Sequence, residues 1–225
     1  MLLKWCVLLC CFLGTLQAKE IAYFSPPSTW KVIHQSPSSA VKISFVGKAK
    51  KNCQPVINLA TEEVDVSLRE YLAIVQKNCE ADPNKEWRDL GKFSTAAGEG
   101  RLVEILDKSE GKALRHLQLI LLKDTMIYVV TATSSQKEFS KLYKEFYASF
   151  KSFNIVSDLL DAVKERDAKE KLKILCAQIL KEKKFQKNTW DLFAKTILNN
   201  YTEMGNYWKL LLLQDIKDKL THTQD

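Results

Sequence analysis

The sequence of 225 residues predicts an α+β fold, an antiparallel sheet covered by helices and followed by an all-helical extension. Three observations lead to this prediction. Four segments with strand-like alternation follow one another between residues 87 and 133, separated by short gaps. Two amphipathic stretches begin with Ser-x-x-Glu, a pattern typical of helix starts. Residues 156–184 contain neither glycine nor proline and have apolar residues at helical spacing.

The first 18 residues have the features of a secretory signal peptide. Lys4 precedes an apolar stretch, Trp5–Leu16, and Ala18 precedes charged residues. This stretch is shorter than the ~20 residues of a membrane helix, so we expect cleavage after Ala18 and no stable membrane span afterwards. The alternatives are a retained anchor and a lipid attached to Cys10 or Cys11, although neither cysteine follows a small residue.

The charge that remains after cleavage is mildly basic. The chain has 34 basic and 27 acidic residues, and loss of Lys4 leaves 33 against 27. The lysines are scattered, as they are on solvated surfaces, and export argues against a nucleic-acid partner. We therefore expect the protein in the periplasm or cell envelope, or secreted, with envelope or other exported proteins as partners.

Three cysteines lie outside the predicted leader: Cys53, Cys79 and Cys176. An odd number allows one disulfide and one free thiol. Cys53 precedes a predicted strand and Cys79 ends the following helix, so both belong at one end of a strand–helix unit. We hypothesise a Cys53–Cys79 disulfide in an oxidising compartment. The alternative is a buried thiol at Cys79 and a loop residue at Cys53.

The first half of the body predicts short strands and one helix. Trp30–His34 and Val41–Val46 are strand candidates with a turn between them, and Val56–Ala60 is a third. The helix begins at the capping box Ser67–Glu70 and ends at Asp82–Asn84. Its apolar residues recur at helical spacing: Leu68, Tyr71, Leu72, Val75 and Cys79.

The second half predicts an antiparallel meander, because gaps this short connect neighbouring antiparallel strands. Its strand candidates are Trp87–Ala97, Arg101–Leu106, Ala113–Leu122 and Met126–Thr133. Gly98 and Gly100 resemble part of a phosphate loop, but a strand rather than a helix follows them. We expect a hairpin turn whose glycines adopt positive φ. Glu99 and Arg101 at its tip are candidate partner contacts.

Helices predominate after the meander. A second capping box, Ser135–Glu138, opens a helix, and one long amphipathic helix is predicted over 156–184. Two further helices follow, separated by Gly205-Asn206, and Trp208 and Leu212 in the last one are candidate partner contacts. The predicted parts are a signal peptide (1–18), an α+β domain (19–154) and a helical hairpin or small bundle (155–225). Three arrangements of the extension are compatible with the sequence: it packs on itself, it docks on the α+β domain, or it binds a partner.

The sequence contains few histidines and none of the common catalytic motifs that we considered. His34 and His116 are the histidines of the body, and the alternation around His116 predicts a half-exposed structural residue. None of the patterns HExxH, CxxC or GxSxG occurs. Acidic residues at 62, 63 and 65 precede a helix start, where they stabilise the helix dipole; a weak cation site is the alternative. We expect no catalytic residue, no cofactor and no metal.

The order of segments resembles the PsbP-like family, which includes the DcrB-like envelope proteins. The resemblance covers about residues 28–154 and leaves the extension outside. It implies a twisted antiparallel sheet with helices on both sides, serving mainly as a binding or accessory module, with no shared catalytic residues. The segments that carry it are an extended opening with Trp30, the strand Val56–Ala60, the helix start Ser67–Leu72, the glycine hairpin before Arg101, the strand Tyr128–Thr133, the helix with Glu138-Phe139 and the closing Ala148–Phe153.

Together these observations predict an exported, non-catalytic envelope protein that binds or scaffolds other proteins. The alternative is a small-ligand carrier or an enzyme that uses a pocket between the sheet and a helix. A cavity with converging polar groups favours the alternative, whereas an apolar patch on the helical extension favours a binding module.

Cleavage of the leader is directly testable. Because a short apolar core followed by Ala18 directs signal peptidase, mass spectrometry of the native protein is expected to show Lys19 as the first residue. A native protein that retains residues 1–18 would contradict export by cleavage and favour the membrane anchor.

Overall fold

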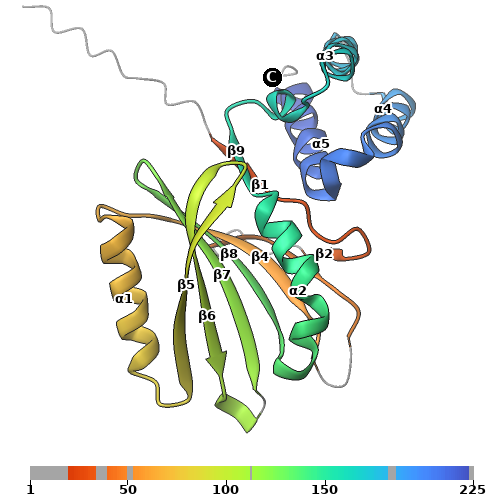
Figure 1. The fold of residues 1–225 in the computed structure, drawn as a ribbon. Coiled ribbons are helices and arrows are strands. Elements are labelled where there is room, and N and C mark those ends of the chain that lie inside the picture. Colours follow the sequence, from red (N-terminus) through yellow and green to blue (C-terminus); the bar gives the residue numbers. More distant parts are fainter. Residues whose placement is uncertain (1–19, 34–39, 50–52, 112, 182–185, 223–225) are drawn as a thin grey trace, which may run out of the picture.

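The computed structural model describes residues 20–33, 40–49, 53–111, 113–181 and 186–222. The predicted leader and His34 lie outside these described residues. Within them, an antiparallel sheet carries two helices, and three further helices form the C-terminal extension (Figure 1). The predicted α+β fold class is therefore confirmed.

The main sheet has seven strands in the order β2-β3-β4-β8-β7-β6-β5, and every neighbouring pair is antiparallel (Figure 1). A separate two-stranded ribbon pairs β1 (Ile21–Tyr23) with β9 (Asn154–Val156). The strands of the main sheet are β2 (Lys31–Ile33), β3 (Val41–Val46), β4 (Val56–Glu63), β5 (Lys85–Thr95), β6 (Gly98–Asp107), β7 (Leu114–Lys123) and β8 (Met126–Ser135). The predicted meander thus forms β5 to β8.

Alternation along the strands divides the interior into two layers. Leu102 of β6 belongs to the larger core, whereas the next residue, Val103, belongs to a smaller one. Helix α1 (Leu68–Glu80) packs Leu68 and Leu72 against the smaller core. Helix α2 (Gln136–Lys151) buries aromatic residues such as Phe146 in the larger core. The two helices therefore cover opposite faces of the sheet.

The two predicted capping boxes have different outcomes. At α1, the Ser67 hydroxyl accepts a hydrogen bond from the Glu70 backbone N–H, and the Glu70 carboxylate accepts one from the Ser67 N–H, so this box is confirmed. At α2, the helix begins at Gln136 with Ser135 as its N-cap residue, as predicted, but the Ser135 side chain makes no capping hydrogen bond, so the hydrogen bonds expected of the second box are not confirmed. Ser135 is the last residue of β8, and the neighbouring Gln136 N–H donates to the Ala113 carbonyl instead.

The two hairpin glycines are required for different reasons. Gly98 has φ of +127°, which confirms the predicted positive φ at this turn. Gly100 does not have positive φ, and it lies against β7. A Cβ atom added at Gly100 would be 2.7 Å from the Ile120 carbonyl oxygen. Close approach of neighbouring backbones, and not turn geometry, therefore explains Gly100.

The single long helix predicted over 156–184 is wrong. A short 3₁₀ helix, η2 (Leu159–Ala162), comes first, and Val163 is extended. Helix α3 (Arg166–Leu180) then starts anew, because the Glu165 carboxylate accepts hydrogen bonds from the first backbone N–H groups of this helix. The helices α4 (Lys187–Asn200), η3 (Thr202–Met204) and α5 (Gly205–His222) complete the extension.

The extension docks on the body through an aromatic cluster. The ring of Phe24 packs against those of Phe45 in β3 and Tyr207 in α5, with centroid distances of 5.8 and 5.6 Å. Phe45 and Tyr207 are 5.7 Å apart, so all three rings touch. Body and extension thus share one continuous hydrophobic core. No helix among the described residues is long and apolar enough to span a membrane.

The buried carboxylate of Glu104 in β6 is paired with arginines of both neighbouring strands, β5 and β7. The Glu104 side chain is only 7% exposed and accepts hydrogen bonds from Arg88 and Arg115 on the neighbouring strands. Burial raises the pKa of Glu104, but these two guanidinium groups outweigh that effect and hold the pKa below its ordinary value of 4.5. Arg115 also stacks over Phe139 of α2 at 4.8 Å, which connects the pair to this helix.

Replacement of Tyr207 tests whether the two parts fold as one unit. Tyr207→Ala is expected to lower the free energy of unfolding by about 3–5 kcal/mol, because it leaves a cavity beside Phe24 and Phe45. Urea unfolding is expected to remain a single transition that shifts to lower urea. Leu192→Ala, at an exposed position, is the control and should change stability by less than about 0.5 kcal/mol. Two separate transitions, with only one shifted by Tyr207→Ala, would contradict a shared core.

Candidate binding pocket

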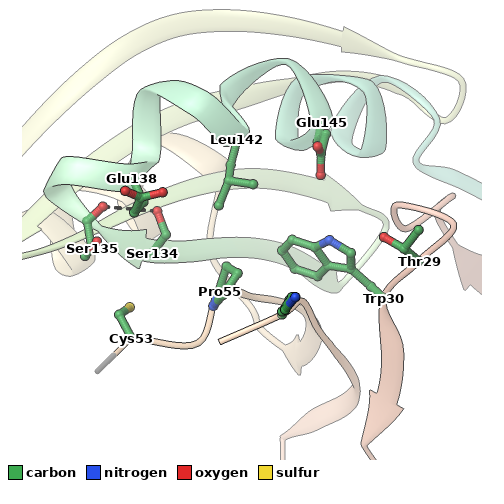
Figure 2. Close-up of a pocket in the computed structure, with 10 residues that line it drawn as sticks. Thr29, Trp30, Cys53, Pro55, Ser134, Ser135, Glu138, Leu142 and Glu145 are labelled. Atoms are coloured by element: carbon green, nitrogen blue, oxygen red, sulfur yellow. Dashed lines mark hydrogen bonds between the residues drawn. The ribbon is translucent and has the colours of Figure 1, made fainter. Parts of the chain in front are cut away.

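A pocket of about 210 Å³ lies beside α2, where three other parts of the chain meet this helix (Figure 2). The segment before β2, the connection from β3 to β4 and the end of β8 form its other walls. Its lining residues are Thr29, Trp30, Lys48, Cys53, Pro55, Ser134, Ser135, Glu138, Leu142 and Glu145.

Trp30 is held firmly in the wall of this pocket. Its side chain is almost fully buried, and its ring meets that of Phe146 edge-on at 5.9 Å. Its backbone N–H donates to the Pro27 carbonyl, which closes the turn before β2. Gly47 leaves room for the ring, since a Cβ atom at this position would be 2.8 Å from Trp30 Cε2. The ring of Phe146, the turn closed at Pro27 and the backbone at Gly47 together fix the orientation of the indole.

The indole N–H of Trp30 forms no hydrogen bond with any residue that the structure describes. Trp30 is one of the residues that line the pocket. Figure 2 shows the nitrogen edge of Trp30 and the carboxylate of Glu145 turned toward one another across the pocket. A donor and an acceptor therefore face each other without a direct bond.

Helix α2 supplies an acidic wall. Glu138, Leu142 and Glu145 are spaced by four and three residues, which places them along one face of the helix. Glu138 accepts a hydrogen bond of 2.9 Å from Lys141. Glu145 is exposed and makes no hydrogen bond or ion pair within the described part of the chain. Two carboxylates flanking a leucine favour a ligand with a positive charge and an apolar portion.

The opposite wall supplies donors. Lys48 follows β3 and lines the pocket, and it forms no ion pair with any described carboxylate. The hydroxyl of Ser134 is buried and donates to the Ser135 carbonyl at 3.3 Å. Cys53 lies beside these groups. This wall therefore offers hydrogen-bond donors to a ligand.

Three larger and more open grooves surround the fold. One of about 620 Å³ lies between α1 and the β5–β6 hairpin, and one of about 510 Å³ lies between α3 and α4. A third, of about 540 Å³, lies at the junction of the sheet, β1 and α5. Its lining is mainly apolar and includes Tyr128 and Tyr207.

The predicted contact residues of the hairpin line the first of these grooves. Glu99 forms an ion pair with Lys92 at 2.8 Å, and Arg101 binds both carboxylate oxygens of Asp89. These hydrogen bonds from Arg101 hold the pKa of Asp89 below its ordinary value of 3.8. Both side chains are on the surface but already paired within the chain, and a role for them in partner binding stays a prediction.

The predicted contact residues of the extension lie in the core instead. Trp208 is fully buried and its indole N–H donates to the Leu159 carbonyl at 2.9 Å, while Leu212 is buried in the shared core. The expectation that these residues meet a partner is thus corrected, because α5 turns them toward η2 and the body. Leu210 in the same run is partly exposed, as expected for consecutive leucines on one helix.

The hypothesised Cys53–Cys79 disulfide is not formed in the structure. Cys53, Cys79 and Cys176 are all free thiols. Cys53 lines the pocket beside α2, whereas Cys79 belongs to α1 on the opposite face of the sheet. The strand–helix reasoning missed this separation because the connection after β4 carries α1 across to β5, at the far edge of the sheet.

Sequence reasoning named a pocket between the sheet and a helix only as an alternative, and it assigned no residues to this pocket. It assigned Trp30 to a strand and Glu138 to a helix cap, and it gave no role to Lys48 or Glu145. The available signal was the spacing of Glu138, Leu142 and Glu145 on a predicted helix. Nothing local indicates that Trp30, more than a hundred residues earlier, faces this helix.

Comparisons with known proteins find similar solved structures but no similar sequence. No family model matches the sequence, and no curated protein matches it. Among solved structures, LpqN of Mycobacterium tuberculosis, involved in cell envelope biogenesis, is 12% identical with a TM-score of 0.49, covering 64% of this chain and 87% of LpqN. CyanoP, the PsbP protein of Synechocystis sp. PCC 6803, is 10% identical with a TM-score of 0.45, covering 64% of this chain and 96% of CyanoP.

A third similar solved structure is that of a Ran-binding protein. The Ran-binding protein Mog1p of Saccharomyces cerevisiae is 14% identical with a TM-score of 0.40, covering 60% of this chain and 94% of Mog1p. These structures include a PsbP protein, the family that the order of segments resembles. At such identities and TM-scores the comparisons assign neither a family nor a function.

Thiol reactivity tests the arrangement of the cysteines. Burial raises the pKa of Cys79 above its ordinary value and that of Cys176 to about 11, so both are protonated and shielded near pH 8. Iodoacetamide is expected to modify Cys53 first in the folded protein, and all three after unfolding without reductant, as read by peptide mass spectrometry. A linked Cys53–Cys79 peptide before reduction would restore the disulfide hypothesis.

Proposed function

We propose that the protein is an exported, non-catalytic accessory module that binds another exported protein through its helical extension. The observation that carries this proposal is the exposure of apolar side chains on α3 and α4. Leu192 is 68% exposed and Ile174 is 58% exposed, the two highest values among the large apolar side chains of the described residues. Both lie on helices whose other faces are buried in the shared core.

The groove between α3 and α4 gives this surface its shape. It has a volume of about 510 Å³, and Ile174 and Leu175 of α3 line it together with Tyr201 at the end of α4. Single exposed apolar residues are common on protein surfaces, but apolar residues beside a groove are typical of sites that receive a helix or an extended segment. An apolar segment of a partner protein would remove this surface from water.

The position of His116 supports a non-catalytic role. Its Nδ1 atom lies 2.8 Å from the Thr133 hydroxyl, and burial lowers its pKa below the ordinary value of 6.5. The ring is therefore neutral near pH 7 and engaged in the sheet, as the sequence predicted for a structural histidine. It does not line the pocket beside α2.

A second candidate function is that of a small-ligand carrier. The observation that favours it is the pocket beside α2, where Trp30, Lys48 and Glu145 present groups of complementary types that have no partner among the described residues. This function is compatible with the first, because the pocket and the groove between α3 and α4 lie on different parts of the chain.

Site-specific photo-crosslinking tests the proposed surface. A photoreactive phenylalanine analogue at Leu192 or Ile174 is expected to give discrete crosslinked products in cells that export the protein. Ile74, 51% exposed on α1, is the matched control and should give few or none. Adding Leu198→Lys, at an exposed position of α4, is expected to reduce the Leu192 products several-fold, since a charge opposes burial in an apolar interface. Equal crosslinking from Ile74, or none from α3 and α4, would overturn the proposal.

A further inference from the structure

We propose that the pocket beside α2 binds a free amino acid or a similarly small zwitterion, with its ammonium group toward Glu145 and its carboxylate toward Trp30 and Lys48. This inference goes beyond the proposed partner surface and does not depend on it, since the two sites share no residues. It rests on the distribution of charges and donors between the two walls, on the indole of Trp30 and on the size of the pocket.

The acidic wall selects an ammonium group. Glu138 and Glu145 project from the same face of α2, and Glu145 has no partner among the described residues. A ligand ammonium group has three donors and no acceptor, so it pairs with the Glu145 carboxylate, whereas Glu138 lies about 10 Å away, two helical turns earlier. Its hydrogen bonds to carboxylates are charge-assisted and stronger than neutral ones.

The opposite wall selects a carboxylate. The Trp30 indole N–H and the Lys48 ammonium group come from the segment before β2 and the connection after β3, and both are donors only. Both groups line the same pocket, so a ligand carboxylate there has two donors to accept from. Lys48 and Glu145 form no ion pair with each other, so each remains available to one end of a ligand.

The indole of Trp30 is the observation that distinguishes this pocket from an ordinary charged surface. The side chain is 7% exposed and lines the pocket, and its N–H has no hydrogen-bond partner in the described chain. Figure 2 shows this nitrogen edge directed toward the space between Trp30 and Glu145. A ligand acceptor there would gain a hydrogen bond from a donor that packing has already oriented.

A ligand that carries only the ammonium group or only the carboxylate does not complement both walls of the pocket. A simple amine would leave Trp30 N–H and Lys48 without an acceptor, and a simple carboxylate would face the two glutamates of α2. The volume of about 210 Å³ corresponds to about seven liquid waters, the scale of a small molecule. Leu142 and Pro55 provide apolar surface for a small aliphatic side chain.

The indole N–H signal of Trp30 in a ¹H–¹⁵N NMR spectrum is a direct reporter, assigned by its loss in Trp30→Phe. Titration of the full chain with L-leucine is expected to shift this signal saturably, because the ligand carboxylate accepts its hydrogen bond. The matched probes 3-methylbutylamine and 4-methylpentanoate each lack one charge. Each is expected to bind at least about tenfold more weakly, the loss of one charge-assisted hydrogen bond.

Paired variants separate the site from the general surface charge. Glu145→Gln and Lys48→Met are each expected to weaken L-leucine binding by about tenfold, whereas the controls Glu63→Gln and Lys137→Met, at exposed positions outside the pocket, should leave it unchanged. Well-dispersed spectra of all variants establish that they fold. No saturable shift of the Trp30 signal at millimolar L-leucine would overturn the proposal. Binding of the amine as tight as that of L-leucine would also overturn it and identify a cation site instead.

Discussion

The contact of Phe24 with Phe45 and Tyr207 is the interaction on which the rest of the structure depends. It joins the N-terminal segment, the sheet and the last helix at one point, with ring centroids less than 6 Å apart. The residues just before Phe24 form β1, which pairs with β9 at the start of the extension. The residues after it lead through the turn at Pro27 to Trp30, so the same segment also builds the pocket.

The two faces of the sheet differ in how they are covered, and this difference decides where the candidate sites lie. The larger core is rich in aromatic residues of α2, which brings the acidic face of this helix against Trp30 and Pro55. The smaller core under α1 contains few residues, and the groove beside it is lined by the paired charges of Asp89 and Arg101. The α2 face is thus covered by a large aromatic core, whereas a small core and a charged groove lie on the α1 face.

The pocket and the extension support two kinds of binding in one chain. The pocket presents fixed polar groups of opposite character within about 210 Å³, which suits a small charged molecule. The helices α3 and α4 present exposed apolar side chains beside an open groove, which suits a protein segment. Tyr207 and Trp208 connect these regions through the core, because α5 contacts both the body and η2.

The sequence alone determined the elements whose signal is local. The alternation of β5 to β8, the capping box at Ser67 and the turn at Gly98 depend on residues within a few positions of one another, so their periodicity and φ preferences are visible in the chain. Tertiary structure decided the interruption at Val163, the burial of Trp208 and the separation of Cys53 from Cys79. It also decided the pocket, in which Trp30 faces Glu145. Each of these depends on contacts between segments far apart in sequence, and local patterns do not specify which distant surface a residue will meet.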